Sequence, residues 1–163
     1  MKQCEGYDGS RIAFDLQFFY YSFLNRCTSD WGGSAATIFP DSGSPTLPFD
    51  LRHSASIPKS IIFKDSGWHC SYCFQELAQF RNKLRSFAHE ALDLPKIHEQ
   101  DRIVNSIHNS VFFFRDRPDA ERWRRVDPDH VDTPQHVLDN ADRFSFLLDR
   151  SGPTAELSDF KAS

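Results

Sequence analysis

A histidine stands directly before a Cys-x-x-Cys pair in the stretch SGWHCSYCF, residues 66–74. Imidazole and thiol groups at this spacing can hold zinc, exchange disulfides or brace a fold. A structural zinc site needs four ligands, and this stretch holds one Cys-x-x-Cys knuckle next to His69. The remaining zinc ligands would have to come from Cys4, Cys27, His89 or His98, which lie at irregular distances from it along the sequence.

The pair also has the local context of a thiol–disulfide oxidoreductase. An apolar strand, a short loop and a tryptophan precede it, so Cys70 and Cys73 are predicted to lie at a helix N-terminus, where the dipole favours a thiolate. The βαβ unit expected before such a pair does not appear in the pattern. A thioredoxin-like oxidoreductase using Cys70 and Cys73 is the alternative function, and a disulfide or two buried thiols beside Trp68 and Phe74 is the purely structural interpretation.

Composition and charge exclude several classes of protein. The 163 residues suit one domain, and 16 Phe, 4 Tyr and 3 Trp favour an aromatic core or a stacking surface. The net charge of −4, with acids and bases interleaved, disfavours nucleic acid as a partner. No stretch approaches the roughly 20 apolar residues of a membrane span, and no signal-peptide core follows Met1, so secretion would need a targeting segment outside this chain.

Strands are predicted first along the chain. Residues 14–24 alternate and then become continuously apolar, which predicts one strand buried on both faces at its far end. Turn residues at 27–34 lead to a short strand at 35–39, a hairpin partner for the first. A long loop rich in proline and serine is predicted at 40–59, and a third short strand at 60–65.

Three helices are predicted next. Residues 73–91, 101–111 and 133–148 carry helical periodicity, with Asp101 as the cap of the second helix and Thr133-Pro134 as the cap and first residue of the third. The expected apolar positions are Phe74, Leu77, Leu84, Phe87 and Ala91, then Ile103, Ile107 and Val111. Strands followed by helices predict an α+β fold, or one half of a larger α/β domain.

Five segments in register resemble glycosyltransferase family 17, which contains the β-1,4-mannosyl-glycoprotein 4-β-N-acetylglucosaminyltransferases and many fungal relatives. The stretch SGWHCSYCF matches the family's Gly-Trp-His-Cys-Ser-x-Cys-Phe signature at every fixed position. The other segments are FFYYSF at 18–23, DWGGSAATIF at 30–39, KLRSFAHE at 83–90 and LDNADRFSFLLDR at 138–150. The resemblance spans about residues 14–160.

This resemblance implies an inverting transfer of N-acetylglucosamine from UDP-N-acetylglucosamine to the 4-hydroxyl of the core β-mannose of an N-glycan. It implies a GT-A-like α/β fold, a Mn²⁺ cofactor, and a place in the Golgi lumen through a membrane anchor outside this chain. A carboxylate would take the acceptor proton, while cations would neutralise the departing diphosphate.

The family's nucleotide-binding half, with its Asp-x-Asp motif, has no counterpart before residue 14. Asp127-Pro128-Asp129 spells the motif, but it lies in a proline-containing loop and is interpreted as a turn. Residues 1–163 are therefore interpreted as one truncated glycosyltransferase domain, with residues 1–13 outside the match and without the half that catalysis needs.

The resemblance and the side-chain chemistry together assign the candidate site. His69 is the expected metal ligand, with a hydrogen-bonded core histidine as the alternative. The expected sugar-stacking residues are Trp68 and Tyr72, the candidate catalytic acids are Asp65 and Glu90, and the structural cysteines are Cys70 and Cys73. In an oxidising lumen the cysteines are expected to pair with each other or with Cys27.

Overall fold

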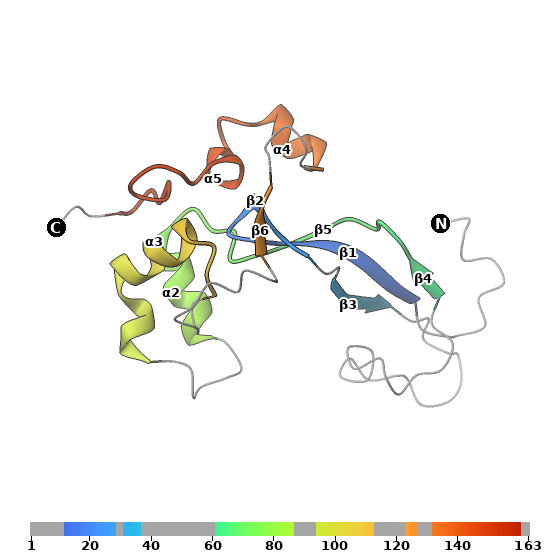
Figure 1. Ribbon diagram of the computed structural model, residues 1–163, viewed down its shortest axis with the longest axis horizontal. Helices are drawn as coiled ribbons and strands as arrows, with labels where there is room; N and C mark the ends of the chain where they lie inside the picture. The colour runs from blue at the N-terminus through green and yellow to red at the C-terminus, as the bar shows by residue number, and fades with distance from the viewer. Residues whose placement is uncertain are drawn as a thin grey trace. The chain divides into compact units, whose positions relative to one another are not determined.

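The computed structural model describes residues 12–28, 31–36, 61–86, 94–112, 123–126 and 132–160, which are coloured in Figure 1. They form a mixed α/β structure with a largely antiparallel sheet and several helices. The chain divides into two compact units, Met1–Gln17 with Asp30–His69, and Phe18–Ser29 with Cys70–Ser163. The loop predicted at 40–59 and the Asp127-Pro128-Asp129 turn lie outside the described residues.

In the first unit, strand β1 (Ile12–Tyr20) pairs on both sides through its opening residues. It runs antiparallel to β3 (Trp31–Ala36) and parallel to β4 (Ile61–Phe63), which confirms the strand predicted at 60–65. The chain then turns and returns beside β1, where the Gln17 N–H donates to the Gly67 carbonyl at 2.9 Å. These bonds place the opening of β5 (Trp68–Ser71).

The turn predicted at residues 27–34 is wrong for its second half, where the structure has strand β3. It begins at Trp31, and Phe14 of β1 lies opposite Ser34 in the register. Pairing with β1 satisfies the backbone of a glycine-containing stretch that local propensity assigns to a turn. Antiparallel pairing with the first strand is as predicted, although residues 37–39 of the predicted partner lie outside the described part.

The prediction of a single strand over residues 14–24 is wrong. Strand β1 ends at Tyr20, and β2 (Ser22–Cys27) returns antiparallel to it. Between them Tyr21 has φ 68°, a left-handed conformation that a bulky residue rarely adopts. Tertiary contacts hold it there, because the Tyr21 hydroxyl donates to the Val111 carbonyl at 2.6 Å and its ring is fully buried.

A late strand, β6 (Trp123–Arg125), completes the sheet of the second unit. It pairs antiparallel with β2, and Asn25 lies opposite Arg125 in the register. The sequence pattern does not predict this strand, since three residues carry too little alternation to be distinguished from a loop.

Helix α2 (Leu77–Arg85) begins four residues later than predicted. Its first turn is capped from a distant part of the chain, because the Asp159 carboxylate accepts the N–H groups of Leu77 at 2.6 Å and Ala78 at 3.0 Å. The predicted apolar face is confirmed at Leu77 and Leu84, which are buried together with Phe80, whereas Phe87 and Ala91 lie outside the described residues.

Helix α3 (Gln100–His108) follows the 3₁₀ turn η4 (Pro95–His98) and lies beside α2 in Figure 1. Ile103 and Ile107 are buried, as predicted. Two details were predicted wrongly. Asp101 lies in the first turn while Glu99 occupies the cap position, and Val111 follows the helix, where its N–H donates to the Ser106 carbonyl.

The third predicted helix is two short helices, α4 (Gln135–Asp139) and α5 (Ser145–Leu148). Pro134 is the cap of α4 instead of its first helical residue. Asn140 ends α4, and its side chain donates to the His136 carbonyl at 2.8 Å. Asparagine competes in this way with backbone hydrogen bonding, which explains why the helix stops within an apolar pattern.

Aromatic side chains dominate the core of the second unit. The ring centroids of Tyr20 and Tyr72 are 5.3 Å apart, as are those of Phe74 and Phe80. Both the β1–β2 turn and the segment before α2 therefore pack on the same cluster as α2 and α3. Within the described parts of the chain, no helix is long and apolar enough to cross a membrane.

Candidate functional site

Three of the residues predicted for the site lie in one short segment of the first unit. Asp65 is exposed in the turn after β4 with φ 48°, while Trp68 and His69 open β5. The Trp68 side chain is 42% exposed, and His69 is partly buried. Successive strand residues point to opposite faces, so Trp68 and His69 are directed to different sides of β5. Glu90 lies outside the described residues.

Tyr72 belongs to the core of the second unit. Its side chain is only 5% exposed, and burial raises the pKa of its hydroxyl to about 12. The ring lies 6.3 Å from that of Phe80, centroid to centroid. The sugar contact assigned to Tyr72 stays a prediction, and the ring packs against Tyr20, Phe74 and Phe80.

Cys70 and Cys73 form a disulfide, with their Cα atoms 5.7 Å apart. Cys27 is buried and takes no part in a disulfide. The pair encloses Tyr72, which has φ 55°, so the bridge closes a tight left-handed turn between β5 and α2. It does not stand at a helix N-terminus as predicted, because α2 begins at Leu77.

A metal site would require several ligand side chains to converge. Among the residues whose structure is described, no group of three or more His, Cys, Asp and Glu side chains could hold a metal ion. His69 as a metal ligand therefore stays a prediction, and the described residues do not supply a complete ligand set around it.

Arg150 is a buried residue that the sequence pattern missed. Its side chain is 5% exposed and donates to three backbone carbonyls, those of Tyr21 at 3.2 Å, Ala155 at 2.9 Å and Phe74. The guanidinium also lies 5.3 Å from the centre of the Phe146 ring. Burial lowers the Arg150 pKa to about 10, so the group remains a cation at neutral pH.

These hydrogen bonds join three of the five segments on which the family resemblance rests. Tyr21 belongs to FFYYSF, Phe74 ends SGWHCSYCF, and Arg150 ends LDNADRFSFLLDR. A guanidinium suits this role, because backbone carbonyls accept hydrogen bonds and a guanidinium is a planar donor with five N–H groups.

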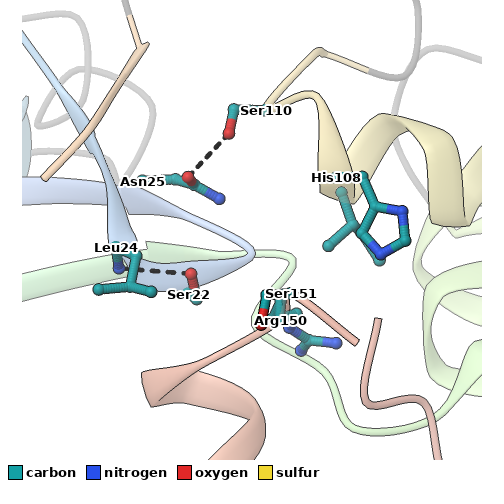
Figure 2. Close-up of a pocket in the computed structure, with 8 residues that line it drawn as sticks. Ser22, Leu24, Asn25, His108, Ser110, Arg150 and Ser151 are labelled. Carbon is teal, nitrogen blue, oxygen red and sulfur yellow. Dashed lines mark hydrogen bonds between the residues drawn. The ribbon is translucent and has the colours of Figure 1, made fainter. Parts of the chain in front are cut away.

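A polar cavity of about 140 Å³ lies beside Arg150 in the second unit (Figure 2). Its lining residues are Ser22, Leu24, Asn25, Ile107, His108, Ser110, Arg150 and Ser151. The Ser110 hydroxyl donates to Asn25 Oδ1 at 2.7 Å, and His108 Nε2 bonds to the Gly152 carbonyl at 2.8 Å. Of the lining residues, Ser22 and Arg150 belong to segments that carry the family resemblance, but no sequence signal connects His108 or Ser110 to a site.

A second hollow, wider and more open, runs along α3 and measures about 380 Å³. Its lining residues are Glu99, Asp101, Arg102, Asn105, Ser106, Asn109 and Val111. Its volume lies within the range of small-molecule sites, and its polar side chains come from α3 and the residues on either side of it.

Comparison with protein families gives one match. The model of glycosyltransferase family 17 matches residues 1–152, which confirms the resemblance found in the sequence. The match includes residues 1–13, which the sequence motifs left outside the resemblance, and the interpretation as a truncated domain without the catalytic half stays a prediction. A search of curated proteins and a search of solved structures gave no match.

Proposed function

Because the chain belongs to glycosyltransferase family 17, we propose that it transfers N-acetylglucosamine from UDP-N-acetylglucosamine to the 4-hydroxyl of the core β-mannose of an N-glycan. The family match over residues 1–152 is the observation that carries this proposal. A glycosyltransferase takes a sugar donor and an acceptor, and the particular sugars follow from the family's acetylglucosaminyltransferases.

Trp68 is the proposed contact for the sugar substrate. Its indole is 42% exposed on β5, and an accessible aromatic face can stack on the apolar face of a pyranose ring. The neighbouring turn presents the exposed carboxylate of Asp65, which can accept a proton from a bound hydroxyl if that hydroxyl lies within hydrogen-bond reach. Glu90 is the other proposed acid.

Mn²⁺ is proposed as the cofactor, with His69 as one ligand. When bound, such an ion would stabilise the charge of the departing diphosphate. The described residues do not form a ligand set, so its other ligands would have to come from elsewhere. Mn²⁺ electron paramagnetic resonance tests this directly, since His69→Gln should weaken binding of the ion, and unchanged binding would remove His69 from the site.

The Golgi lumen is the proposed location. The Cys70–Cys73 disulfide supports it, because disulfides persist in oxidising compartments and are rare in the cytosol. Imaging of the tagged protein beside a Golgi marker should show overlap, and an exclusively cytosolic signal would contradict the location.

A transfer assay with UDP-N-acetylglucosamine and a free N-glycan acceptor tests the function. Trp68→Ala should raise the acceptor KM about tenfold, equivalent to roughly 1.4 kcal/mol of lost binding, while Trp68→Phe retains much of the stacking. Leu138→Ala is the matched control, because Leu138 is an exposed apolar residue of similar accessibility at 46%.

Two outcomes of this assay have different meanings. If the wild-type protein transfers no N-acetylglucosamine to any N-glycan, the proposed function is wrong. If it is active and Trp68→Ala behaves as Leu138→Ala does, the function stands and the sugar contact lies elsewhere.

A further inference from the structure

The cavity beside Arg150 has a chemistry that the proposed transfer reaction does not use. We propose that it is a binding site for a single tetrahedral oxyanion, a phosphate or sulfate group, held by Arg150, Asn25 and Ser22. This inference does not depend on the proposed function, since it rests on the donors, the volume and the charge of the cavity.

Hydrogen-bond donors are in excess around the cavity. Ser22 Oγ accepts the Leu24 N–H at 3.3 Å, which leaves its own O–H to donate to another acceptor. Asn25 Oδ1 is already occupied by the Ser110 hydroxyl, and Figure 2 shows the Asn25 amide nitrogen pointing toward the His108 side. The surplus of donors therefore favours a ligand made of acceptors.

Arg150 adds a positive charge to the lining, and two of its N–H groups take no part in its hydrogen bonds to carbonyls. Its three hydrogen bonds to backbone carbonyls use three of the five N–H groups of a guanidinium. Carbonyl dipoles satisfy these N–H groups but do not neutralise a buried charge, which is costly to desolvate. An oxyanion beside the guanidinium would offset that cost through charge-assisted hydrogen bonds.

Among the described residues that line the cavity, none carries a carboxylate. The two closest in sequence are otherwise engaged or lie outside the lining. Asp149 accepts the N–H of Ser151 at 2.8 Å and its hydroxyl at 2.9 Å. The charge of Glu156 raises the Arg150 pKa against the larger effect of burial, and Glu156 is not one of the described lining residues. An anion entering the cavity therefore meets a cation and no lining anion.

The volume of the cavity accommodates a small oxyanion. A cavity of about 140 Å³ holds more than one water molecule, so it has room for a phosphate or sulfate group. A phosphate or sulfate group has five non-hydrogen atoms, whereas a diphosphate or a sugar ring has about twice as many. Residues Ser22 and Asn25 are 1% and 5% exposed, so the donors are held in place by the surrounding core.

Isothermal titration with inorganic phosphate at constant ionic strength tests this site. The wild-type protein should bind one phosphate, and Ser110→Asp should weaken binding at least tenfold by placing a carboxylate at the cavity. Ser110 has φ 53°, a conformation that aspartate tolerates. Ser145→Asp adds the same charge at the exposed start of α5 and should leave binding unchanged.

Ser151→Asp, at the exposed rim, is the second charge variant should Ser110→Asp fail to fold by circular dichroism. Titrations with sulfate and with UDP show whether the site takes a free oxyanion or the terminal phosphate of a nucleotide. Phosphate binding without competition by UDP indicates a free oxyanion, and competition indicates the terminal phosphate of a nucleotide; either supports the site. Failure of all three to bind, or equal binding by the cavity variants and Ser145→Asp, overturns it. Phosphate binding in a protein without transferase activity would refute only the proposed function.

Discussion

Replacing Arg150 by methionine should destabilise the second unit by about 4 kcal/mol. The substitution leaves the carbonyls of Tyr21, Phe74 and Ala155 without their shared donor. Hydrogen bonds to a charged group contribute about 1.5–3 kcal/mol each, so three give roughly 5–9 kcal/mol. Two effects reduce the loss, because methionine carries no charge to desolvate and water in the adjacent cavity can reach some of the carbonyls.

Urea denaturation followed by circular dichroism measures this change. Arg143→Met is the matched control, since Arg143 is exposed and its guanidinium lies 5.1 Å from the Phe144 ring without the buried carbonyl partners. An exposed cation–π contact of this kind contributes about 0.5–1 kcal/mol. Arg150→Lys should keep less than half of the stabilisation that Arg150 provides, because an ammonium group lacks the planar fork that spans the carbonyls. If Arg150→Met is within 1 kcal/mol of Arg143→Met, Arg150 does not join these segments as described.

Three further predictions concern stability. Burial raises the Tyr72 pKa to about 12 from an ordinary value of 10, so the unfolded chain loses that proton first and stability falls between pH 10 and 12, by at most about 3 kcal/mol. Burial also raises the pKa of Tyr20 and Tyr21, which adds to this fall, whereas the lowered Arg150 pKa opposes it. Tyr72→Phe should therefore reduce the fall of the unfolding free energy with pH, as measured by urea titrations. An unchanged fall would contradict this account. Reducing the Cys70–Cys73 disulfide with dithiothreitol should lower the free energy of unfolding by only about 2 kcal/mol, because the loop that it closes is short. The double variant Cys70→Ser/Cys73→Ser should be insensitive to the reductant. A wild-type protein that is equally insensitive would show that the disulfide contributes nothing to stability. Asp159→Ala should cost about 1–2 kcal/mol by uncapping α2, and Asp159→Asn should recover part of this loss; a loss no larger than that of Asp139→Ala, which removes a contact within α4, would show that the cap is not needed.

Elements with a clear period could be predicted from the sequence. The apolar faces of α2 and α3 follow from residues spaced three, four and seven apart, such as Leu77 with Leu84 and Ile103 with Ile107. Strand β4 follows from its β-branched residues. In each case a local property of the chain agrees with its final environment.

Elements decided by distant contacts could not be predicted. Tyr21 takes a left-handed conformation because Val111 and Arg150, 90 and 129 residues away, bond to it. The start of α2 depends on Asp159, and β3 begins at Trp31 because β1 lies beside it. Local propensity carries no information about such partners.

The candidate site divides in the same way. The signature at residues 66–74 could be found because its residue types and spacing are unusual. Arg150 could not, since an arginine after an aspartate at the end of an apolar run is typical of a solvated surface. Only its burial and its carbonyl partners identify it.

The linkage of the product tests the central claim most directly. After incubation with UDP-N-acetylglucosamine and an N-glycan with a free core, mass spectrometry should show one added N-acetylhexosamine. Methylation analysis should place it on the 4-position of the core β-mannose. No addition, or addition at another sugar or position, would contradict the proposed function.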